Sequence, residues 1–149
     1  MKQKKSIRII ICTVIGIFFL SSACAVSAVY AGEIAIVGNK DLTVDSLSKK
    51  DLKSIFLGKK TQWDNGKKII FVILKTGDVH ESFLKQFIGK SVSQYANFWK
   101  KMVFTGKGKK PKSFQTEDEL VAFVGNTSGA VGYILSGSKA DGVKSLSVN

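Results

Sequence analysis

The amino-acid sequence predicts an α/β domain built on a mixed sheet that is flanked by helices. Two observations support this fold class. Short apolar runs such as 33–39 and 69–74 have the composition of β-strands, and the longer segments between them carry apolar residues at helical spacing. Glycine-containing turns separate the two kinds of segment. Strands that alternate with helices in this way are typical of a sheet with helices on its faces.

The first strand is predicted over residues 33–39, and a helix is predicted in the segment 46–60. Ser48 and Asp51 stand three residues apart, as in a capping box, so this helix should begin there. Gly58 should end it, because glycine readily takes the left-handed conformation that follows many helices. The buried face of the helix would hold three apolar residues: Leu52, Ile55 and Phe56.

A second strand is predicted over residues 69–74, directly after an Asp-Asn-Gly turn at 64–66. Every residue of this run is apolar, so both of its faces should be buried. We therefore expect this strand to lie in the middle of the sheet. Trp63, just before the turn, would either plug the end of the core or line the mouth of a cleft, and the first interpretation is preferred.

Two helices are predicted next, in the segments 76–89 and 91–108. Gly89 would end the first, and Ser91 with Gln94 would cap the second. The apolar stripe of the first helix consists of Phe83, Leu84, Phe87 and Ile88. That of the second consists of Val92, Tyr95, Phe98, Trp99, Met102 and Val103. We interpret both stripes as core faces, since regular spacing is what a buried helix requires.

The last third of the sequence predicts one more helix and two strands. The helix begins after Thr116, which is followed by three acidic residues in its first turn. The strands cover 130–135 and 143–148. The stretch 105–112, rich in glycine and lysine and holding the only proline, is predicted to be a loop.

The N-terminus has the order of segments of a secretory signal peptide, predicted over residues 1–31. Basic residues come first, an apolar run extends from 9 to 20, and small residues follow. Cleavage fits after Ala28 or Ala31, which leaves one domain at 32–149 in the periplasm or outside the cell. An uncleaved membrane anchor is the rival interpretation, and a lipoprotein processed at Cys24 is a weaker one. After cleavage no transmembrane segment is expected.

The composition of residues 32–149 excludes several kinds of chemistry. Loss of residues 1–31 removes four of the 23 basic residues and none of the 11 acidic ones, which leaves a net charge of +8. All remaining basic residues are lysines, so the bidentate arginine contacts that read nucleic acids are absent and no nucleic-acid partner is expected. Both cysteines precede residue 32, so we expect no disulfide, and we expect no cofactor.

Three segments of the sequence resemble small secreted relatives of the phosphate-binding component of ABC transporters. They are IFLGKKTQW at 55–63, FLKQFIGKSVSQYANFWKKMVFTGKGKKPK at 83–112 and ELVAFVGNTSGAVGYI at 119–134. The resemblance implies the fold of one lobe of a type II periplasmic binding protein. It also implies a non-catalytic binding protein, with phosphate or another small oxyanion as ligand and an ABC transporter or an envelope protein as partner.

The resemblance also implies where a ligand would bind. In the family, the strand that matches 71–74 leads into an Arg-Ser-Asp-Gly-Ser-Gly-Thr loop that holds the anion. Without gaps, Lys75 falls on the arginine and Thr76 on the first serine, while the remaining five positions differ. The implied ligand-binding residues are Lys75, Thr76, Gly77 and Asp78. The loop also joins a strand to a helix start, where backbone N–H groups favour anions.

Structural roles compete with ligand binding in this loop. Asp78 could be the N-cap of the following helix, with Glu81 as its capping-box partner, and this interpretation is preferred. His80, the only histidine, is expected on the exposed surface of that helix. Ser82 stands two residues from His80, which directs the two side chains to different sides, so no catalytic pair is expected. A lone histidine likewise predicts no metal site.

The sequence thus supports three functions in descending order. The first is a secreted binding domain that holds an oxyanion through Lys75 and Thr76. The second is an envelope interaction module that has lost its small ligand and meets an acidic partner or membrane through the lysine-rich loop 107–112. The third, a hydrolase, is least favoured because no set of nucleophile, base and orienting group is visible.

Overall fold

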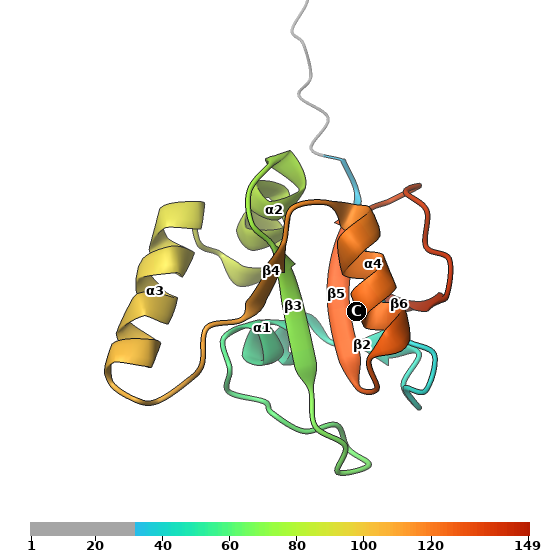
Figure 1. Cartoon of the computed structure of the whole chain (residues 1–149), viewed down its shortest axis with the longest axis horizontal. Coiled ribbons are helices and arrows are strands. Elements are labelled where there is room, and N and C mark those ends of the chain that lie inside the picture. Colours follow the sequence, from blue (N-terminus) through green and yellow to red (C-terminus); the bar gives the residue numbers. More distant parts are fainter. Residues whose placement is uncertain (1–31) are drawn as a thin grey trace, which may run out of the picture.

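The computed structural model describes residues 32–149, which form a six-stranded sheet with helices packed on it (Figure 1). The strands are β1 (Ile34–Asn39), β2 (Ser46–Leu47), β3 (Ile70–Leu74), β4 (Lys112–Phe114), β5 (Ala130–Leu135) and β6 (Val143–Val148). The helices are α1 (Lys49–Phe56), α2 (Asp78–Phe83), the π-helical η1 (Leu84–Ile88), α3 (Val92–Phe104) and α4 (Glu117–Asn126). The predicted mixed α/β fold class is confirmed.

The sheet has the strand order β2-β6-β1-β5-β3-β4. Strand β1 runs antiparallel to both β5 and β6, whereas β3 runs parallel to β4 and β5. The prediction that the strand at 69–74 lies in the middle of the sheet is wrong, because only the short β4 lies beyond β3. Its apolar residues are covered by helices instead: Phe56 of α1 packs against Phe71, with 5.3 Å between ring centroids.

The predicted helix starts are confirmed in three helices. Ser48 caps α1, with its side chain accepting a hydrogen bond from the N–H of Asp51. Ser91 and Gln94 form a complete capping box at the start of α3. Thr116 caps α4 by accepting from the N–H of Glu119. These contacts lie within four residues of sequence, which is why a local pattern predicts them.

The helical segment after β3 also follows its prediction. Its four stripe residues are all buried: Phe83, Leu84, Phe87 and Ile88. Gly89 ends it in the left-handed conformation, with φ of 72°. Phe83 stacks on Tyr133 of β5 with 3.8 Å between ring centroids, so this helix is held firmly against the sheet.

Helix α3 buries less of its apolar stripe than predicted. Tyr95 and Trp99 are buried, and the Tyr95 hydroxyl donates to the carbonyl of Phe56 at 2.8 Å. Val92 and Val103, however, are 36% and 48% exposed. The periodicity correctly identified one apolar face, but only its middle reaches the core. The next residue, Phe104, is 93% exposed.

The amino-terminal end of β3 is closed by Trp63. Its indole is buried and donates from Nε1 to the carbonyl of Gly129 at 3.0 Å, which confirms the prediction that it plugs the core. Gly129 has φ of +74°, and a Cβ there would lie 2.3 Å from the carbonyl oxygen of Lys68. Asp41 joins the same region through an ion pair with Lys67 of 2.7 Å. The Trp63 indole N–H, the Asp41 carboxylate and the Lys67 ammonium thus each have a partner.

The predicted signal peptide, its cleavage sites, the alternative anchor and Cys24 all lie outside the described residues. Within 32–149, none of the helices combines the length and the apolar character needed to cross a membrane.

Candidate ligand-binding site

The four implied ligand-binding residues form the loop between β3 and α2. Lys75, Thr76, Gly77 and Asp78 are all exposed. The backbone N–H of Lys75 donates to the carbonyl of Phe114 at 2.8 Å, which ties the start of the loop to β4. The loop therefore projects from the sheet where the parallel strands β3 and β4 end, a common position for ligands in α/β folds.

The start of α2 carries no side-chain cap. Its N-cap is Gly77, with φ of 105°, and no side chain accepts a hydrogen bond from the first turn. The prediction that Asp78 is the N-cap and Glu81 its capping-box partner is therefore wrong. The Glu81 N–H donates to the carbonyl of Gly77 instead. The first-turn N–H groups keep their capacity for other acceptors, as helix starts without caps do.

His80 is not on the exposed surface, contrary to the sequence prediction. Its side chain is 3% exposed, and its Nδ1 lies 2.5 Å from the hydroxyl of Tyr133. The backbone N–H of Leu74 donates to that same hydroxyl at 3.0 Å. The Tyr133 hydroxyl therefore contacts both the Leu74 N–H and the imidazole, and the imidazole tautomer decides which side chain donates the hydrogen bond between His80 and Tyr133.

Burial sets the protonation state of His80. Desolvation lowers the pKa of its imidazole from 6.5 to about 4, so the ring is neutral at neutral pH. Burial likewise raises the pKa of the Tyr133 hydroxyl, which remains a donor. The sequence did contain a signal for this position. His80 precedes Phe83 and Leu84 by three and four residues, which places it on the same apolar face.

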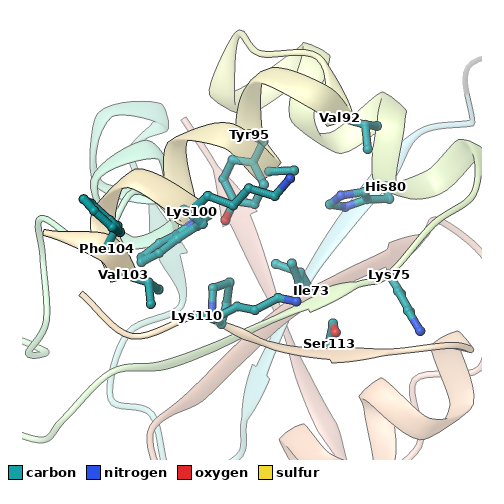
Figure 2. A pocket seen from close by; sticks show the side chains of 13 residues that line it. Ile73, Lys75, His80, Val92, Tyr95, Lys100, Val103, Phe104, Lys110 and Ser113 are labelled. Carbon is teal, nitrogen blue, oxygen red and sulfur yellow. The ribbon is translucent and has the colours of Figure 1, made fainter. Parts of the chain in front are cut away.

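An apolar pocket of about 500 Å³ opens beside the loop, between α3 and the strands β3 and β4 (Figure 2). Its lining residues are Ile73, Lys75, His80, Val92, Tyr95, Ala96, Trp99, Lys100, Val103, Phe104, Lys110, Pro111 and Ser113. Sequence reasoning found Lys75 but missed the pocket itself. The pocket depends on how far α3 stands from the sheet, which no local pattern encodes.

Three lysines give this pocket a positive potential. Lys75, Lys100 and Lys110 belong to its lining, which includes no acidic residue. Within residues 32–149, the ion pairs shorter than 4.0 Å use other lysines, at positions 60, 67 and 144. Figure 2 shows the side chains of Lys100 and Lys110 extending into the space between α3 and β3. An anion would be attracted to this space.

The described residues hold no group of three or more histidine, cysteine, aspartate or glutamate side chains arranged to bind a metal ion. His80 directs Nδ1 to Tyr133 rather than to Ser82.

Comparison with known proteins identifies the fold. No protein-family model matches the sequence, and a search of curated proteins returns no match. Among solved structures, the chain is similar to an ABC-type phosphate transport receptor from Vibrio cholerae, with a TM-score of 0.64 and 24% identity. The match covers 78% of this chain and 46% of the receptor. It is also similar to PstS from Borrelia burgdorferi, with a TM-score of 0.61 and 17% identity, over 79% of this chain and 47% of that one.

The described domain has the fold of one lobe of a type II periplasmic binding protein. The chain spans less than half the length of the solved structures that it resembles. The sequence motifs that carry the resemblance are explained by packing. A Cβ at Gly58 would lie 2.9 Å from the Trp99 ring, and a Cβ at Gly132 would lie 2.7 Å from Leu120. These positions preserve the fold and do not by themselves specify a ligand.

Proposed function

We propose that this protein is a secreted or periplasmic, non-catalytic binding protein that holds phosphate or a similar small oxyanion at the loop Lys75-Thr76-Gly77-Asp78. The observation that carries the proposal is the fold shared with a phosphate transport receptor, together with an exposed Lys75 at the end of β3. The uncapped start of α2 adds backbone donors beside that lysine.

Binding at this loop would be weak and sensitive to salt. Two-lobed binding proteins close around their ligand, so that donors from both sides replace the water lost by the ion. The described domain corresponds to one side of such a clamp. Its loop is exposed, so the attraction between Lys75 and an anion is screened by solvent and by counterions. The carboxylate of Asp78 would oppose the anion at short range.

Substitution of Lys75 by alanine tests the site directly. Titration calorimetry with inorganic phosphate at low ionic strength should detect weak binding to the natural protein and none to Lys75→Ala. Lys85→Ala, an exposed lysine on η1, is the matched control because it removes the same charge away from the loop. Equal phosphate affinity in the natural protein and in Lys75→Ala would rule out this site.

A second function, an envelope interaction module, is favoured by one observation. Phe104 is 93% exposed and lies beside the lysine-rich loop 107–112, so an apolar side chain and positive charges share one surface. An ABC transporter subunit or another envelope protein with an acidic surface would fit it. In that case no small anion would raise the melting temperature, and a purified envelope partner would bind in a salt-sensitive manner that Phe104→Ser weakens.

A further inference from the structure

We propose that the pocket between α3 and β3 binds an organic anion, with its apolar chain inside the pocket and its anionic head at Lys100 and Lys110. The proposal does not depend on phosphate binding at the β3–α2 loop, because the head group is placed at Lys100 and Lys110 and Lys75 is the one loop residue that also lines the pocket. The ligand class also differs, since inorganic phosphate has no apolar part to place against the pocket walls.

The size and walls of the pocket suit the apolar part of such a ligand. Its volume of about 500 Å³ lies within the range of pockets that hold small organic molecules. The buried walls come from three elements: Ile73 of β3, Tyr95 and Trp99 of α3, and Pro111 ahead of β4. Val92 and Val103 stand partly exposed around it and would be covered by a bound chain. Burial of this apolar surface would drive binding.

The lining of this pocket carries positive charge without acidic groups to match it. Lys100 and Lys110 form no ion pair with the described carboxylates. The imidazole of His80 extends toward the pocket (Figure 2), and its Nδ1 is the ring nitrogen that contacts Tyr133. An apolar pocket with a few donors and no acceptor charge selects an anion.

Charge also argues for a small anion over a second copy of the chain. Residues 32–149 carry a net charge of +8 (19 lysines against 11 acidic residues), and the lysines at this pocket would face a partner that is equally basic. Like charges brought together at an interface oppose association. A neutral lipid would contact the apolar walls but leave the lysine ammonium groups without a counter-ion. An apolar chain that ends in a carboxylate or phosphate both contacts the walls and supplies the counter-ion.

Titration calorimetry with a set of eight-carbon probes tests the ligand class. At low ionic strength octanoate and octyl phosphate should both bind, and each should bind at least 10-fold more tightly than octylammonium, which has the same chain and the opposite charge. If only octyl phosphate binds, the carboxylate part of the proposal fails. If octylammonium binds as tightly as octanoate, charge recognition fails and the proposal is overturned.

One matched pair of variants tests the position of the site. Ala96 is exposed on α3 and lines the pocket, so Ala96→Phe should fill the pocket without disturbing the core. Asn97→Phe adds the same ring at a neighbouring exposed position outside the lining. Octanoate affinity should fall at least 10-fold in Ala96→Phe and should be unchanged in Asn97→Phe. Equal affinities in the two variants would overturn the proposed position.

The head group is tested by charge removal. The double variant Lys100→Gln/Lys110→Gln should bind octanoate at least 10-fold more weakly, whereas Lys101→Gln/Lys107→Gln, with the same charge change outside the pocket lining, should not. Thr76→Val, which changes the phosphate loop outside the pocket lining, should weaken inorganic phosphate binding and retain octanoate, so the two sites fail separately. Sedimentation that shows a dimer dissociated by Ala96→Phe but not by Asn97→Phe would identify a second copy as the occupant and would overturn the proposal.

Discussion

The two ends of strand β3 differ in whether their polar groups have hydrogen-bond or ion-pair partners. At the amino-terminal end, Trp63 is buried with its Nε1–H bonded to Gly129, and Asp41 accepts from Lys67, Ser128 and the backbone of Gly129. At the carboxyl-terminal end, the four loop residues are exposed, no side chain caps the helix, and the adjacent pocket is lined by lysines that form no ion pair with the described residues.

This contrast assigns stability to one end of β3 and ligand binding to the other. We call the end of β3 with Trp63 the closed end. There the loops before β3 and β5 are held together by paired polar groups and by close contacts at glycine. The exposed loop and the lysines without ion pairs at the open end, the end with Lys75, are available to a ligand. Substitutions at the closed end should therefore change the free energy of unfolding, and those at the open end should change affinity.

The largest effect is expected from glycine substitutions at the two ends. Gly129→Ala forces a residue with a side chain into φ of +74° and brings its Cβ within 2.3 Å of a backbone oxygen. Strain and overlap together should cost more than about 3 kcal/mol. Gly77→Ala at the open end has φ of +105° but no atom within 4 Å of the new Cβ, so only backbone strain of about 1–2 kcal/mol is expected. Urea denaturation of both variants measures the difference, and equal losses would contradict the contrast.

The next effect is a pH dependence that arises from His80. Its pKa is about 4 in the folded protein and 6.5 in the unfolded chain, so between these values the unfolded state binds more protons. The contribution of His80 to the free energy of unfolding should therefore be fully present above pH 6.5. The free energy of unfolding should fall as the pH is lowered toward 4, by up to about 3 kcal/mol in total.

Denaturant titrations between pH 4.5 and 7.5 measure this slope. His80→Gln should remove the part of the slope that comes from histidine, since His80 is the only histidine in the sequence. Any slope left in this variant would come from carboxylates. The Lys67 and Ser128 hydrogen bonds hold the pKa of Asp41 below its usual 3.8, so that carboxyl titrates outside the measured range. A slope of equal size in His80→Gln would show that the histidine is not the source.

The smallest effect is expected from the ion pair at the closed end. Asp41→Asn weakens the 2.7 Å contact with Lys67, but both side chains are about one third exposed, so the loss should be about 1 kcal/mol or less. Asp45→Asn is the control, because Asp45 pairs with Lys144 but is 84% exposed and should contribute nothing measurable. Thermal unfolding of the two variants in low and high salt compares them. A larger loss for Asp45→Asn would reverse the expected order.

Local sequence patterns predicted the long elements of this fold well. The starts of α1, α3 and α4 depend on hydroxyl side chains three residues from the N–H groups that they accept from, and such contacts are visible in any short window. The two shortest strands were missed. Strand β2 has two residues and β4 has three, too few to show an alternating pattern.

The candidate site was predicted only in part. Lys75 was assigned from the resemblance to the phosphate-binding family; it lines the pocket, and its role in ligand binding stays a prediction. The pocket was missed because its walls come from α3, from β3 and from the segment around β4, which meet only through long-range packing. The role of His80 was missed because its partner, the Tyr133 hydroxyl, lies 53 residues away in β5.

The sequence by itself determined where the longer strands and the helices lie, which faces of the helices are apolar and where three of the helices begin, because these properties depend on neighbours within about one helical turn. Only the tertiary structure decided that β3 lies next to an edge strand, that His80 is buried and neutral, and that α3 stands apart from β3 and β4 with lysines around the space between them. The physical reason is that burial and cavity shape depend on contacts between distant segments. The chain acquires those contacts only when the whole sheet has formed.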